Sequence, residues 1–82
     1  MASNIASTIE SFIVEEIMMV SKETRIDLES SLIKSGIVDS LSLLRLISFL
    51  EEKFGIVIDD EDVVPENFDT IKIMESLVAE KL

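Results

Sequence analysis

Two small polar side chains, Asp39 and Ser40, follow Gly36 and come directly before the mostly apolar segment 41–50. The N-terminus of a helix favours an anion, because its first N–H groups are unpaired and its dipole is positive there. A serine at that position is well placed to carry a phosphodiester. The same pair also fits plain helix capping, in which the Ser40 hydroxyl accepts from an unpaired N–H and Asp39 is favoured by the dipole. The two residues alone leave both interpretations open.

The element that would present this pair is a helix predicted over residues 40–54. Its residues are good helix formers, and Gly55 is a typical residue to end it. Apolar side chains occur nearly all the way round this helix, which is typical of a central helix or of one that offers apolar surface to a partner. Since one helix in so small a protein cannot be covered on every side, we expect some of Leu41, Leu43 and Leu44 to be exposed.

Two further helices are predicted around it. Apolar residues recur at helical spacing over residues 5–20, and again over residues 70–82, where Asp69 or Thr70 would cap the helix. Phe54 is expected to lie in the core, because it stands at the end of the central helix. No strand pattern competes seriously with this interpretation.

Two connections separate the helices. Residues 21–36 are polar, and a few aliphatic side chains would pin this long segment to the core. Residues 56–69 are rich in acids, and Pro65 prevents one continuous helix there, so a short helical turn or two is expected. The sequence therefore predicts an all-α fold, a small antiparallel four-helix bundle of three main helices and one short helix, in a single domain over residues 1–82.

The residue types that are missing exclude most enzymes. The 82-residue chain has no Cys and no His, and it also lacks Trp and Tyr. It therefore has no thiol of its own, no disulfide and no imidazole to act as a general base or metal ligand. An enzyme built from this chain would have to use carboxylates, hydroxyls and a few Lys and Arg side chains, so we expect the chain not to be an enzyme.

The charge of the chain excludes other partners. Seventeen acids against seven bases give a formal net charge of −10, which would repel nucleic acid and anionic membranes. No basic region followed by an apolar stretch begins the chain, and no apolar run is long enough to span a bilayer. We therefore expect a cytoplasmic monomer, and the initiating Met and short tails favour a stand-alone protein.

The whole chain resembles the acyl and peptidyl carrier protein family. The segment "SGIVDSLSLLRLISFLEEKFGIVI" matches the Asp-Ser-Leu attachment motif after a glycine loop and the helix that follows it. The segment "SLIKSG" is similar to the anchored loop before the site, with Leu32 as the apolar anchor, and "PENFDTIKIMESLV" is similar to the closing segment. The resemblance covers essentially all of the chain in the right order.

The resemblance implies a covalent cofactor on Ser40. A phosphopantetheinyl transferase would move 4′-phosphopantetheine from coenzyme A to the serine oxygen, and the thiol of that arm would carry an acyl or aminoacyl group as a thioester. Asp39 matches the family position beside the attachment serine, where it helps the transferase and its metal. The absence of Cys agrees with an imported thiol. The carrier itself needs no metal.

Partner enzymes would have to contact the surface beside Ser40. Leu41 and Leu44 lie one turn apart directly after the serine, so they are the expected apolar contacts for a loading enzyme and a downstream acyltransferase. Acids of the second connection, Asp60 and Asp62, would add electrostatic attraction.

The same helix departs from the pattern of carriers for fatty acid synthesis. Those carriers are usually acidic around the attachment site, whereas this chain has no acid between Ser40 and Leu50 and has Arg45 there. This favours aminoacyl, peptidyl or specialised acyl cargo. A simpler interpretation of Arg45 is that it pairs with nearby carboxylates.

The sequence suggests two other functions. A small helical interaction domain without a prosthetic group would use the same exposed leucines as a docking patch. Calcium binding by the acidic segment is rejected, because an EF-hand loop needs a central Gly, and residues 59–70 contain none.

Overall fold

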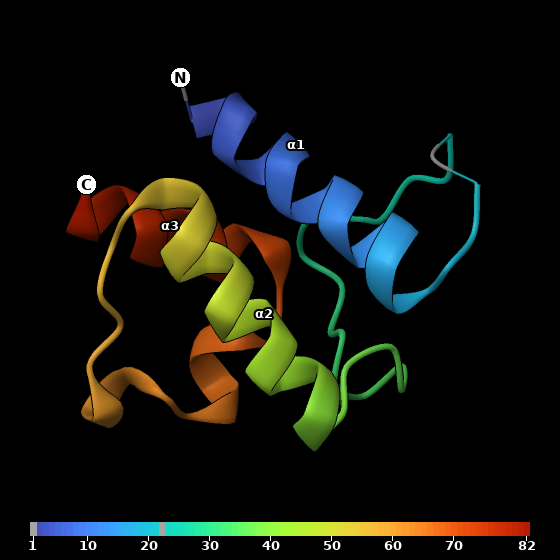
Figure 1. The fold of residues 1–82 in the computed structure, drawn as a ribbon. Helices are drawn as coiled ribbons and strands as arrows, with labels where there is room; N and C mark the ends of the chain where they lie inside the picture. Colours follow the sequence, from blue (N-terminus) through green and yellow to red (C-terminus); the bar gives the residue numbers. More distant parts are fainter. Residues whose placement is uncertain (1, 22) are drawn as a thin grey trace.

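The computed structural model describes residues 2–21 and 23–82, and every regular element in that part of the chain is helical. The three main helices lie around a common core (Figure 1). The elements in chain order are α1 (Ala2–Phe12), the π-helical turn η1 (Ile13–Ile17), α2 (Ser40–Phe54), the 3-10 turns η2 (Asp60–Asp62) and η3 (Pro65–Phe68), and α3 (Ile71–Lys81). The predicted all-α class, with three main helices and shorter helical turns around Pro65, is confirmed.

The first helix is shorter than its apolar pattern predicts. The α-helix ends at Phe12, and the chain continues as the wider turn η1, which closes when the N–H of Met18 donates to the carbonyl of Ile13 at 2.8 Å. The neighbouring side chains Ile13 and Val14 are both buried in this turn. Met19 then has a positive φ of 56°, so the chain turns away from the helix axis.

The central helix has the bounds that the sequence predicts. It ends where Gly55 adopts a left-handed φ of 64°, a conformation in which glycine is the least strained residue. The expectation for Phe54 is only partly met. Because Phe54 stands at the very end of the helix, its ring is half-buried at the edge of the core. The fully buried phenylalanine is Phe68 of η3.

The last helix begins at a side-chain cap. The Thr70 hydroxyl accepts a hydrogen bond from the N–H of Ile73 at 3.0 Å, which satisfies one of the unpaired donors at the helix start. Three of its apolar side chains, Ile71, Met74 and Val78, are fully buried.

The helices are arranged so that α2 starts at one end of the molecule. Figure 1 shows α1 and α2 running in opposite directions, and α3 packs against α1. The core between them is apolar throughout the described residues. Its members with no exposed surface include Ile9, Ile13, Leu46, Leu50, Phe68 and Met74.

The long connection from α1 to α2 is anchored at two points near its end. Leu32, the predicted apolar anchor, is fully buried, and Val38 is nearly so. Between them Gly36 has a φ of 82°, a left-handed conformation that glycine adopts with the least strain. The anchored connection therefore fixes the position of the chain at the start of α2.

No helix in the described part of the chain combines the length and the apolarity that crossing a membrane would require.

Candidate functional site

Asp39, rather than Ser40, caps the central helix. Asp39 has an extended backbone, with φ −113° and ψ −170°, and its Oδ1 accepts a hydrogen bond from the N–H of Ser42 at 2.9 Å. Ser40 is therefore the first residue inside the helix, which corrects the expectation that its own hydroxyl is the cap. Both residue types are good caps, so only the backbone geometry decides between them.

The same hydrogen bond sets the charge of Asp39. The pKa of its carboxyl group lies below its ordinary value of 3.8, chiefly because the N–H of Ser42 stabilises the ionised form. Asp39 consequently holds a negative charge beside Ser40 at neutral pH.

The Ser40 side chain is exposed at the start of α2. Among the described residues, its hydroxyl has no hydrogen-bond partner. An open groove of about 360 Å³ lies beside it. Apolar side chains from three segments line this groove, namely Ile33 and Val38 of the connection, Leu43 of α2, and Pro65 of η3. The hydroxyl is thus accessible, chemically unengaged and next to an apolar surface.

The two leucines predicted to contact partners are both exposed. Leu41 keeps 73% of its surface accessible and Leu44 keeps 60%, whereas Leu43 packs partly against the core. Ser40, Leu41 and Leu44 therefore form one surface on the first turns of α2. We call these three residues the α2 surface.

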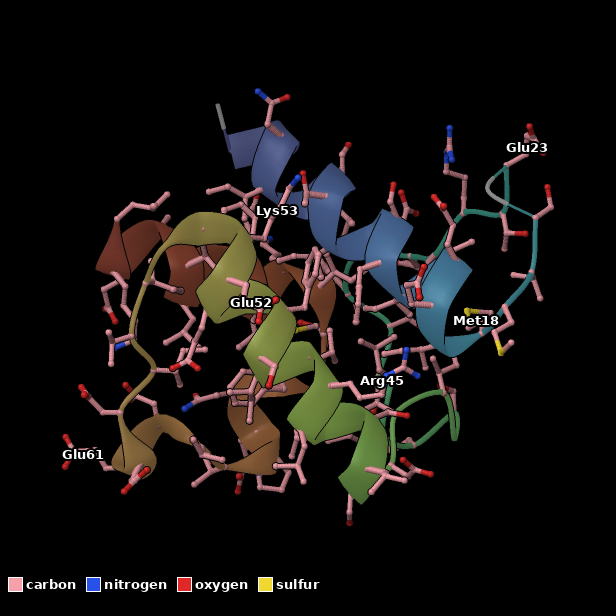
Figure 2. All side chains as sticks on the ribbon, viewed as in Figure 1. Met18, Glu23, Arg45, Glu52, Lys53 and Glu61 are labelled. Atoms are coloured by element: carbon pink, nitrogen blue, oxygen red, sulfur yellow. The ribbon has the colours of Figure 1, made fainter. Side chains whose placement is uncertain are left out.

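The two acids predicted to attract partners lie on a different element and differ in their contacts. Asp60 is exposed in η2, but Asp62 is half-buried and its carboxylate is 2.9 Å from Nζ of Lys81 in α3. That contact raises the pKa of the Lys81 ammonium group, because the hydrogen bond to Asp62 favours the charged form. Figure 2 shows Glu61, which lies between the two acids in sequence, on the opposite side of the view from Arg45.

Arg45 lies on the side of α2 that faces α1 (Figure 2). Its Nη2 is 3.9 Å from Oε1 of Glu16, and its guanidinium carbon is 6.0 Å from the centre of the Phe12 ring. That ring is stacked on Phe49 with 4.1 Å between centroids. The simpler interpretation of Arg45 is therefore confirmed: it pairs with a neighbouring carboxylate, in a contact that is exposed and weak.

No cluster of three or more acidic side chains within residues 2–21 and 23–82 is arranged to hold a metal ion. The acidic segment after α2 contains two short turns instead, and the carboxylates of Asp59 and Asp62 are both paired to Lys81, at 3.8 and 2.9 Å.

Asp69 makes contacts that its sequence position does not reveal, since that position indicates only a possible helix cap. Its carboxylate accepts from the Ser31 hydroxyl at 2.6 Å and from the N–H of Ile33 at 3.2 Å. Its carbonyl accepts from the N–H of Leu32 at 2.7 Å. These partners are more than thirty-five residues away in sequence, and no local pattern indicates such contacts.

Comparison with known proteins identifies the family. The family described as "Phosphopantetheine attachment site" matches residues 11–78. Among solved structures, the one described as "Structure of KstB-PCP(apo)" is 34% identical, with a TM-score of 0.78. The match covers 98% of this chain and 88% of that one. A search of curated proteins found no significant match.

Proteins of this family carry covalently attached 4′-phosphopantetheine. They are carriers rather than catalysts, and they interact with a phosphopantetheinyl transferase and with catalytic enzymes. The family match spans most of the chain and includes the exposed serine at the start of α2, and the fold agrees with that of a PCP over nearly its whole length. The chain belongs to the phosphopantetheine-binding carrier proteins.

Proposed function

We propose that Ser40 carries the 4′-phosphopantetheine arm and that the chain shuttles thioester-bound groups between partner enzymes. The observation that supports this most directly is the exposed, unengaged hydroxyl at the first residue of α2, within the matched segment. The arm supplies the thiol that the polypeptide lacks, and this thiol holds the acyl or aminoacyl group.

Loading is a transfer of a phosphoryl-linked group to oxygen. The Ser40 oxygen attacks the phosphorus of coenzyme A that bears the pantetheine. A phosphorus–oxygen bond forms to the serine, the bond within the diphosphate breaks, and adenosine 3′,5′-bisphosphate leaves. The hydroxyl proton passes to a base of the transferase, because the chain has no histidine.

The start of α2 suits the phosphodiester that this reaction leaves. The positive end of the helix dipole and its unpaired N–H groups favour an anion on the first residue. Asp39 occupies one donor, that of Ser42, and so fixes the first turn before loading. We assign Asp39 this supporting role, together with a negative charge that is available to the metal ion of the transferase.

Partner enzymes that reach the arm have to approach the α2 surface. Leu41 and Leu44 provide exposed apolar area beside Ser40, which suits them as anchors for the transferase, the loading enzyme and the downstream acyltransferase. Asp60 is the better placed of the two acids to attract a basic partner, because Asp62 is already paired with Lys81.

The cargo is proposed to be aminoacyl, peptidyl or specialised acyl rather than that of bulk fatty acid synthesis. The polar positions of α2 between Ser40 and Leu50 carry no acid. The structural neighbour, at 34% identity, is named as a PCP, the usual abbreviation for a peptidyl carrier protein.

The test is the intact mass of the protein after incubation with coenzyme A, Mg²⁺ and a phosphopantetheinyl transferase of broad specificity. We expect one phosphopantetheinyl group on the wild type, none on Ser40→Ala, and one on Ser42→Ala, which changes a serine two residues further along the same helix. Ser40→Ala is expected to keep its fold, because Asp39 supplies the cap. An unlabelled wild type would instead favour an interaction domain without a prosthetic group. Labelling of Ser40→Ala would place the arm on another serine.

A further inference from the structure

One residue from the C-terminal part of the chain holds the connection before Ser40 in place. Asp69, between η3 and α3, binds three consecutive residues, Ser31, Leu32 and Ile33. Its carboxylate Oδ1 accepts from the Ser31 hydroxyl and the Ile33 N–H, and its backbone carbonyl accepts from the Leu32 N–H. Hydrogen bonds to a charged acceptor are the stronger class, so this contact is the main polar fixation of the segment.

Further contacts connect these three residues with the start of α2. The Leu32 carbonyl accepts from the N–H of Val38 at 3.1 Å, which closes the Gly36 turn. Val38 is buried, and the next residue, Asp39, caps the helix that begins at Ser40. A continuous series of hydrogen bonds and packed side chains therefore connects the Asp69 carboxylate with the backbone of the serine.

Asp69 also determines one side of the groove beside Ser40. Ile33, whose N–H is bound to the Asp69 carboxylate, lines the groove together with Ser40 and Pro65. On its other side Ile33 borders a second hollow, which Asp69 itself lines. Without the carboxylate, the 31–33 segment would keep only the buried Leu32 side chain and backbone contacts to hold it.

We propose that Asp69 is a positioning residue for the loading of Ser40: it pre-orders the 31–39 segment, and with it the serine and the groove, before the transferase binds. This inference rests on Ser40 being the attachment residue. A pre-ordered segment matters because the transferase otherwise binds only those carrier molecules whose segment is ordered. The apparent affinity then falls by the same factor as the ordered fraction of the carrier.

Four variants separate positioning from mere stability. Asp69→Ala removes both side-chain acceptor bonds, whereas Asp69→Asn keeps an oxygen at the same place that can accept both. Glu29→Ala is the matched control, because Glu29 tethers the same connection to α3 through an exposed contact of 3.3 Å with Lys72. Ser31→Ala, which removes one donor to Asp69, is a milder variant for the case that Asp69→Ala does not fold.

The first readout is amide hydrogen exchange of the apo protein. In Asp69→Ala the N–H groups of Ile33 and Val38 should exchange faster than in the wild type, whereas Leu50 in the core should be unchanged. Asp69→Asn and Glu29→Ala should exchange like the wild type at Val38. Unchanged exchange at Val38 in Asp69→Ala would overturn the proposal, because the fixation would then not extend beyond the residues that Asp69 touches.

The second readout is steady-state loading at a temperature where every variant is folded. Asp69→Ala should raise the KM for the carrier by roughly tenfold, as for a competent conformer populated at about 10%, with kcat within about twofold. Ser31→Ala should raise KM by less, and Asp69→Asn and Glu29→Ala should match the wild type. If wild-type Ser40 is loaded and Asp69→Ala has an unchanged KM, the positioning role fails alone. If wild-type Ser40 is not loaded at all, the proposed function fails, and the positioning role fails with it.

Discussion

The two faces of α2 carry the same residue type in opposite surroundings. Leu46 and Leu50 on the inner face have no exposed surface, whereas Leu41 and Leu44 on the outer face keep 73% and 60% of theirs. The inner face also carries Leu43, which packs partly against the core, and Phe49 stacks on Phe12 of α1. The outer face begins directly after Ser40, on the first turns of the helix. An apolar helix in a small domain can thus supply both the core and a contact surface, and only its neighbours decide which.

The largest effect that tests this comparison is on stability. Leu50→Ala should lower the free energy of unfolding by about 2–5 kcal/mol, because it leaves a cavity in a fully packed core. Leu44→Ala, the same substitution on the same helix, should change it by less than about 0.5 kcal/mol. Urea unfolding of both variants measures the difference, and equal losses would mean that the two faces of α2 do not differ in packing.

The next effect concerns loading. Leu44→Asp should lower kcat/KM for the transferase by roughly tenfold or more, because it places an unpaired charge in the contact with the enzyme. Val57→Asp is the control, since Val57 is 73% exposed but lies beyond the other end of α2. Circular dichroism confirms folding before the kinetics are compared. Equal loading of both variants would move the contact away from the α2 surface.

A smaller effect is expected at the cap. Asp39→Ala should lower the Tm by a few degrees at neutral pH, because the N–H of Ser42 loses its acceptor, whereas Asp39→Asn should lower it less, because it keeps an acceptor but loses the charge. The pKa of Asp39 is lowered in the folded protein, so its ionised form stabilises the fold above the ordinary value of 3.8. This contribution is lost as the pH falls through the folded pKa. Thermal unfolding between neutral pH and pH ~3 should therefore show the gap between Asp39→Ala and wild type closing in acid. A gap that is independent of pH would assign the cap to another group.

The smallest effect tests whether the contact surface extends beyond α2. Asp60→Asn should slow association with the transferase by roughly two- to threefold at low salt and have no effect at high salt, as expected for an exposed charge at the rim of an interface. Asp62→Asn should instead weaken the contact with Lys81. Its main effect should be a lower Tm, with only a minor change in loading. Stopped-flow association at two ionic strengths compares the variants. An Asp60 effect that persists at high salt would mean a direct contact instead.

The sequence predicts the elements whose limits are set locally. The bounds of α2 follow from a cap and from Gly55, and the start of α3 follows from Thr70. The wider turn after Phe12 could not be predicted, because a repeat of apolar residues is nearly the same for an α-helix and for one π-helical turn. The burial of Phe68 rather than Phe54 depends on how η3 packs against α3 and the rest of the core, which no local pattern contains.

The candidate site likewise has features that the sequence predicts and features that depend on the fold. Ser40 and the exposed leucines follow from a short motif and from the size of the chain. The choice of Asp39 as the cap, the pairing of Asp62 with Lys81 and the contacts of Asp69 all depend on geometry across the fold. A single sequence contains the residue types for these contacts but not the distances.

The positions of the first and last helical residues have a consequence for how such a protein can be attached to other molecules. Figure 1 shows the start of α1 and the end of α3 on one side of the molecule, away from the start of α2. A tether at either end therefore leaves Ser40 facing outward. The same domain can be fused to another domain, form part of a longer polypeptide or be immobilised on a support through its ends. In each case the surface around Ser40 stays accessible to a partner enzyme.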